Sequence, residues 1–108
     1  MKKFIGLLVV VSLSAFATEP SPTAKVSKLM SYAEYGGGDL VFVLETNGSI
    51  CKSGYYLKKT DPGFEAGLSM LLSAYHAKTP IRVDGHTDQR WAGSSGYFCH
   101  VYDIGLGY

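Results

Sequence analysis

The chain lacks an excess of charge of either sign, because ten Lys and Arg residues stand against nine Asp and Glu and the formal net charge at pH 7 is +1. Nucleic-acid binding is therefore not expected, since a phosphate backbone is bound through clustered Lys and Arg. Internal repeats and low-complexity segments are also absent. The expected organisation is a single small domain.

A long hydrophobic run occurs only once. Two lysines precede the run "FIGLLVVVSLSAF", and Ala15-Phe16-Ala17 supplies the small residues of a cleavage site, which is the order of a secretory signal. The run is too short to span a bilayer comfortably, and no second one follows. We predict a signal peptide at residues 1–17 and a mature chain exported to the periplasm or beyond, with no transmembrane segment. Its net charge would be about −1, because both leader lysines are lost.

Cysteine is scarce, with one pair, Cys51 and Cys99. A pair of cysteines in an exported protein predicts a disulfide. Closing a loop of about 49 residues stabilises a fold by roughly 4 kcal/mol in the chain-entropy model. That is a large share of the total stability of so small a domain.

Most of the remaining pattern predicts β-strands. Residues 18–23 carry two prolines and are interpreted as a flexible lead-in to a domain over residues 24–108. Asn47-Gly48 is a hairpin signal, because both turn positions tolerate positive φ. Gly85–Gly96 is interpreted as a polar loop. The predicted strands are 24–35, 40–45, 50–57, 81–84 and 97–106.

One amphipathic helix is expected between the third and fourth strands. Asp61 is predicted to cap it and Pro62 to occupy its first position, with the helix ending before Thr79-Pro80. The apolar stripe has helical spacing: Phe64, Leu68, Leu71, Leu72 and Tyr75. The order β-β-β-α-β-β would leave sheet edges open unless the sheet closes. We therefore predict a mainly β fold with one helix, a five-stranded OB-fold barrel.

The segment "DGHTD" (residues 84–88) resembles the start of the peptidoglycan-binding motif of outer-membrane-protein-A-like domains. That family then needs a second helix whose arginine grips a peptide carboxylate. The residues after Asp88 predict no such helix, and Arg90 lies in the loop itself. Binding of peptidoglycan remains an alternative function.

The same segment also contains residue types found in metal and catalytic sites. Asp84, His86 and Asp88 alternate and could share one face, but a metal needs three or four converging ligands. Ser94 and Ser95 lack the nucleophile-elbow pattern of hydrolases. We expect no metal, no cofactor and no enzymatic activity, and interpret the segment as a turn.

A binding module is the interpretation that the aromatic content favours. Eight tyrosines and Trp91 offer rigid amphipathic area for interfaces and sugar rings. We expect Trp91 to be exposed or at an interface because its loop is polar. The predicted ligand contacts are Asp88, Arg90, Trp91 and Ser95.

With these features placed, the chain resembles a B subunit of the pentameric bacterial A–B toxins, in the subtilase-cytotoxin and pertussis-toxin group. In that group a strand-borne cysteine precedes a helix, which leads through a short turn into a strand like Ile81-Arg82-Val83 and then a tryptophan loop. The resemblance implies a homopentameric ring of OB-folds that binds cell-surface glycans and can carry an enzymatic A subunit. It also implies that a polar helix face lines the central pore: Glu65, Ser69, Ser73 and His76.

The chain departs from that group in two respects. The glycan-contacting serine and acidic residue cannot be placed, since Thr23, Ser27 and Ser31 are all candidates for the serine's position. The group's second cysteine pair has no counterpart. A small periplasmic inhibitor of a hydrolase therefore also remains an alternative function.

Overall fold

The computed structural model describes residues 17–107, so that nearly all of the predicted signal peptide lies outside the described residues. Six strands and one helix follow in the order β1 (Thr18–Pro20), β2 (Val26–Ser31), β3 (Leu40–Leu44), β4 (Gly54–Leu57), α1 (Phe64–Ala77), β5 (Ile81–Arg90) and β6 (Phe98–Leu106). The prediction of a mainly β fold with one helix is confirmed. Among residues 17–107, no helix has the length and apolar character needed to cross a membrane.

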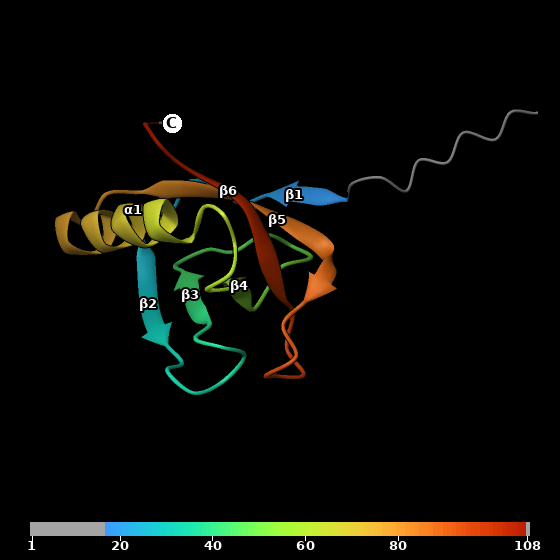
Figure 1. Ribbon diagram of the computed structural model, residues 1–108. Helices are drawn as coiled ribbons and strands as arrows, with labels where there is room; N and C mark the ends of the chain where they lie inside the picture. The colour runs from blue at the N-terminus through green and yellow to red at the C-terminus, as the bar shows by residue number, and fades with distance from the viewer. Residues whose placement is uncertain (1–16, 108) are drawn as a thin grey trace, which may run out of the picture.

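The strands form one mixed sheet in the order β1-β5-β6-β4-β3-β2 (Figure 1). Neighbours are antiparallel except β4 and β6, which are parallel. Six strands replace the predicted five, because an additional strand, β1, precedes the strand expected from residue 24, which is β2. The segment 18–23, expected to be flexible, contributes β1, which ends at Pro20, and Pro22 follows before β2 begins.

The segment from β1 to β2 forms both edge strands of the sheet order. β1 pairs with β5, and beyond it the amide of Ser21 donates to the carbonyl of Val83 over 2.7 Å. Ala24 and Ile81 then exchange two backbone hydrogen bonds of 2.8 and 2.9 Å. From Val26 onward the same segment pairs with β3. One continuous piece of chain therefore connects the first and last strands of the sheet.

Helix α1 covers one end of the sheet and packs against β2 and β6 (Figure 1). It buries Phe64, Gly67, Leu71 and Ala74. The predicted stripe is wrong at Leu72 and Tyr75, which are 42% and 43% exposed. The small residues at 67 and 74 let the helix approach the sheet closely, which rotates the stripe toward them.

The helix begins later than the sequence predicts. Gly63 is its N-cap residue, and no side chain caps it. The carboxylate of Asp61 instead accepts hydrogen bonds from the Lys58 amide at 2.8 Å and lies 2.7 Å from Nε2 of His100. Asp61 thus ties the turn before α1 to β6 rather than capping the helix.

Strand β5 extends well past the predicted residues 81–84, so the expected loop from Gly85 begins only after Arg90. Gly85 explains the extension. A Cβ atom there would lie 3.0–3.1 Å from Tyr55 and from both cysteines, so the strand passes directly over the disulfide. Register shifts after Asp84 and His86 bend β5 around this point.

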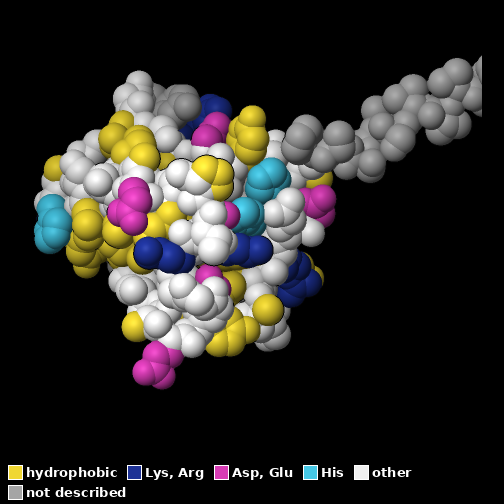
Figure 2. Space-filling view, in the orientation of Figure 1, with side chains coloured by type: hydrophobic (Ala, Val, Ile, Leu, Met, Phe, Trp, Pro, Cys, Tyr) yellow, Lys and Arg dark blue, Asp and Glu magenta, His cyan; other side chains and the backbone are white. Residues whose placement is uncertain are grey.

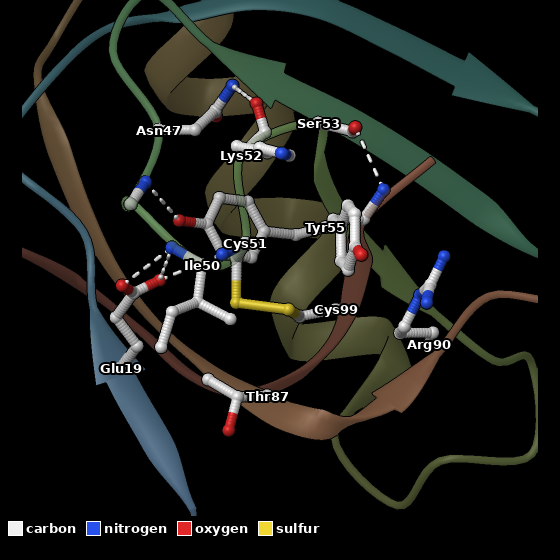
Figure 3. The surroundings of a disulfide bond; sticks show 12 residues. Glu19, Asn47, Ile50, Cys51, Lys52, Ser53, Tyr55, Thr87, Arg90 and Cys99 are labelled. Carbon is white, nitrogen blue, oxygen red and sulfur yellow. Dashed lines mark hydrogen bonds between the residues drawn. A yellow bond between two sulfur atoms is a disulfide. The ribbon is translucent and has the colours of Figure 1, made fainter. Parts of the chain in front are cut away.

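The predicted disulfide between Cys51 and Cys99 is confirmed (Figure 3). Both cysteines are essentially inaccessible to solvent. Beside them the Glu19 carboxylate accepts hydrogen bonds of about 2.9 Å from the amides of Ile50 and Cys51 and from the Ser49 hydroxyl. Burial alone would raise the pKa of Glu19, but these bonds outweigh it and lower the pKa. Strand β1 is thereby fastened to the disulfide loop.

Candidate functional site

Trp91 is buried, whereas its polar loop predicted an exposed side chain. The indole lies against the outer face of the sheet, where Val41 and Tyr56 form a second small apolar cluster with it. Tyr32 and Tyr35 pack on the indole with ring centroids 5.0 and 5.6 Å away. The loop after β5 therefore folds back onto the sheet instead of projecting into solvent.

Asp39 is the hydrogen-bond partner of the indole N–H. Its Oδ2 accepts a hydrogen bond of 2.8 Å from Nε1 of Trp91. The residue is only 4% exposed, and its second carboxylate oxygen, Oδ1, is buried without a hydrogen bond to any described residue. A buried carboxylate with an unused acceptor is costly, because it has lost water without gaining full compensation. It is the kind of group that a ligand donor satisfies.

A hollow of about 330 Å³ opens beside this carboxylate. We call it the Asp39 hollow. It lies between the connection from β2 to β3 (residues 32–39) and the connection from β5 to β6 (residues 91–97). Its main lining residues are Tyr35, Asp39, Tyr56, Lys58, Arg90 and Trp91.

Gly36 fixes the wall on the Tyr35 side. It has φ +64°, and a Cβ atom there would overlap the Asp39 carboxylate. Both the left-handed backbone and the close approach therefore require glycine. The backbone amide of Asp39 donates to the Tyr35 carbonyl over 3.1 Å, which closes the same turn.

The hollow is lined by one negatively charged residue, Asp39, and by two positively charged residues, Lys58 and Arg90. Burial, followed by the charges of Asp39 and Asp61, raises the pKa of Tyr56, so its hydroxyl stays protonated and can donate. Lys58 is exposed and lines the hollow. Arg90 is already engaged, because its guanidinium donates to the carbonyl oxygens of Ser95 and Gly96.

The four predicted ligand contacts are only partly brought together. Arg90 and Trp91 line the hollow, while Ser95 contributes its backbone carbonyl to Arg90. Asp88 is exposed on β5 and does not line the hollow. Asp39, Tyr35 and Lys58 also line the hollow, and no sequence motif predicted them as site residues. The available signal was that Asp39 immediately precedes a buried strand and lies in phase with the outward-facing residues of that strand.

Two histidine side chains lie next to each other on the outer face of β5 and β6. His86 and His100 stack with ring centroids 5.8 Å apart, and two histidine side chains adjoin in the space-filling view (Figure 2). His100 also lies 2.9 Å from Gln89 through Nδ1, so both of its ring nitrogens are occupied. Across residues 17–107 no group of three or more His, Cys, Asp or Glu side chains could hold a metal ion.

Asp84 and Asp103 face each other across the same two strands. Burial, followed by hydrogen bonding and charge repulsion from Asp84, raises the pKa of Asp103. Arg82 lies 3.9 Å from Asp84 and offsets part of this repulsion. The predicted alternation of Asp84, His86 and Asp88 therefore does not form a converging site.

The helix face predicted to line a pore is exposed at Glu65, Ser69, Ser73 and His76. Leu72 and Tyr75 are exposed on the same helix, and apolar side chains are visible over α1 in Figure 2. This face is therefore more apolar than the predicted polar one.

No protein-family model matches the chain. No curated protein matches it either.

Proposed function

We propose that the protein is an exported carbohydrate-binding module that presents the Asp39 hollow to a cell-surface glycan. The observation that carries this proposal is the buried Asp39 carboxylate with its unused oxygen, beside a hollow walled by Tyr35, Tyr56 and Trp91. Sugar hydroxyls are donors of the kind this oxygen lacks, and aromatic rings offer rigid apolar area with polar tips for sugar rings. Export agrees with the disulfide.

The strand pairing supports an OB-type barrel as the scaffold. If β1 and β2 count as one bent strand, five strands remain, with α1 between the third and fourth. That bent first strand pairs with both β3 and β5. The third and fifth strands of this count, which are β4 and β6, pair in parallel. OB-folds bind oligosaccharides beside the loops that join strands 1–2 and 4–5. The Asp39 hollow lies between those two connections.

We also propose that the module forms a homopentameric ring able to carry an enzymatic A subunit. This part rests on the resemblance to toxin B subunits, and the exposed Leu72 and Tyr75 of α1 support self-association because they would otherwise face water. Light scattering of the chain from Thr18 to Tyr108, without reductant, measures the assembly. A mass about five times that of one protomer is expected, and a monomer would refute the ring.

A glycan array tests the binding function. The mature chain is compared with Asp39→Asn, which keeps an oxygen for Trp91 but replaces the free acceptor by an NH₂ donor. We expect Asp39→Asn to weaken glycan binding by roughly 10- to 100-fold, because a hydrogen bond to a charged group contributes about 1.5–3 kcal/mol. The matched control Asp88→Asn, outside the hollow, should bind as the wild type does.

Three outcomes would contradict the proposal. Tight binding to purified peptidoglycan without binding to any glycan on the array would favour the cell-wall function. Capture of a lysozyme-like hydrolase, again without glycan binding, would favour the inhibitor function. Equal glycan binding by wild type and Asp39→Asn would place the site elsewhere.

A further inference from the structure

The outward-facing residues of β3 form a line that extends the candidate site. Leu40, Phe42 and Leu44 enter the core, so the alternate positions 39, 41 and 43 share the outer face. Val41 lies under Trp91, with Asp39 on one side of it and Val43 on the other. Four residues of extended chain span about 13 Å. Trp91 thus lies over the middle of a track longer than the Asp39 hollow alone.

A second hollow, of about 300 Å³, lies at the Val43 end of this track. We call it the Met30 hollow. Cross-strand pairing of Lys28 with Val43 and of Met30 with Val41 forms its floor. Tyr32, Phe98 and Trp91 wall it, and Ser94 and Lys28 are its polar residues.

The two hollows share Trp91, and the residues that follow it are divided between them. Ala92 lines the Asp39 hollow, whereas Gly93 and Ser94 line the Met30 hollow. A Cβ atom at Gly93 would overlap the indole, so the loop lies directly on the Trp91 ring. Gly93 therefore lies at the boundary between the two hollows, against the ring that they share.

The two hollows differ in the contacts they offer. The Asp39 hollow is lined by Lys58 and by Asp39, whose Oδ1 lacks a hydrogen bond, and both side chains suit directed polar contacts with a ligand. Among its described lining side chains the Met30 hollow has no buried acceptor that lacks a hydrogen-bond partner, and it offers mainly apolar and aromatic surface. Each is near the lower limit of about 300 Å³ for a small-molecule site, so neither alone covers a long ligand.

We propose that the two hollows are subsites of one groove, which binds a linear oligosaccharide of at least two sugar residues along β3. Its end residue lies in the Asp39 hollow, and the next residue crosses Gly93 into the Met30 hollow. This inference rests on the proposed carbohydrate-binding function and adds that the protein recognises a chain rather than a single terminal sugar.

Calorimetry with a matched series tests the inference. The probes are the mono-, di- and trisaccharide fragments of the glycan bound most tightly on the array, each retaining the same end residue. For the wild type we expect at least a tenfold gain in affinity from mono- to disaccharide. Val43→Phe fills the Met30 hollow and should remove this gain without changing monosaccharide affinity. Leu106→Phe, a substitution at an exposed position away from both hollows, should leave the whole series unchanged.

Nuclear magnetic resonance spectra of the same samples provide a second readout and show that each variant is folded. The amides of Lys28, Val43 and Ser94 should shift with the disaccharide but not with the monosaccharide. Equal affinity for all lengths, still weakened by Asp39→Asn, would overturn the two-subsite inference and leave the proposed function standing. Failure of every length to bind would overturn the proposed function and the inference with it.

Discussion

The indole Nε1 of Trp91 and Oδ2 of Asp39 lie 2.8 Å apart, although the residues are 52 positions apart in the sequence. The bond joins the connection before β3 to the connection after β5. Both partners are buried, so neither can exchange the bond for water without opening the loops. This one contact therefore sets how the two walls of the Asp39 hollow face each other.

Trp91→Phe should destabilise the fold by about 1–3 kcal/mol, because it leaves the Asp39 carboxylate without its protein donor. Urea denaturation measures the loss. Asp39→Ala removes the same bond, so the double variant should lose clearly less stability than the two single losses together. Tyr102→Phe, at a 60% exposed position, is the control. Additive losses would show that the two residues act independently.

Glu19→Gln should lower the stability of the fold at neutral pH and make that stability depend less on pH in the acid range. The pKa of Glu19 in the folded state lies below its ordinary value of 4.5. Its contribution is therefore present above the unfolded pKa and is lost as pH falls through the folded pKa. Denaturation midpoints between pH 6 and pH 3 should fall more steeply for the wild type than for Glu19→Gln. Glu65→Gln, on the exposed helix face, should keep the wild-type slope.

Replacement of both Cys51 and Cys99 by alanine should cost about 4 kcal/mol, since the bond closes a loop with a sequence separation of 48. Because both residues are buried, dithiothreitol should react with the native protein only as fast as the protein opens. The rate of thiol release, compared with the unfolding rate, measures this. Reduction much faster than unfolding would mean that the disulfide is accessible locally.

Gly85→Ala should destabilise by about 1–3 kcal/mol through overpacking, because the new methyl would lie 3.0–3.1 Å from Tyr55, Cys51 and Cys99. Gly63→Ala is the control for packing, since nothing lies within 4 Å of the corresponding Cβ position and only the small preference for glycine at the N-cap is lost. Thermal denaturation of the two variants should separate them clearly. Equal melting temperatures would contradict the close packing of β5 over the disulfide.

The sequence is informative where local pattern and final structure agree. Phe64 and Leu71 predicted a buried helix face, and Cys51 and Cys99 predicted a disulfide. It fails where a distant residue decides the outcome. Trp91 is surrounded by polar and small residues in the sequence, and only the partnership with Asp39 and the rings of two tyrosines buries it.

The end of β5 shows the same limit. Gly85 looks like the start of a turn when only its neighbours are considered, but the disulfide beneath it makes a residue without a side chain necessary within a strand. The strand order could likewise not be predicted, because it depends on pairing between residues far apart in the sequence. Nothing near Thr18 in the sequence predicts that β1 will pair with residues around His86.

That pairing has a consequence for how the chain is made. Synthesis runs from the N-terminus, so Thr18–Pro20 leaves the ribosome long before Asp84–His86, its only strand partner among the described residues, has been assembled. The earliest strand must therefore wait, unpaired, for one of the last. Contacts this remote in sequence slow folding and leave strand edges open to other chains in the interval. A chaperone that holds the first residues would act at this stage.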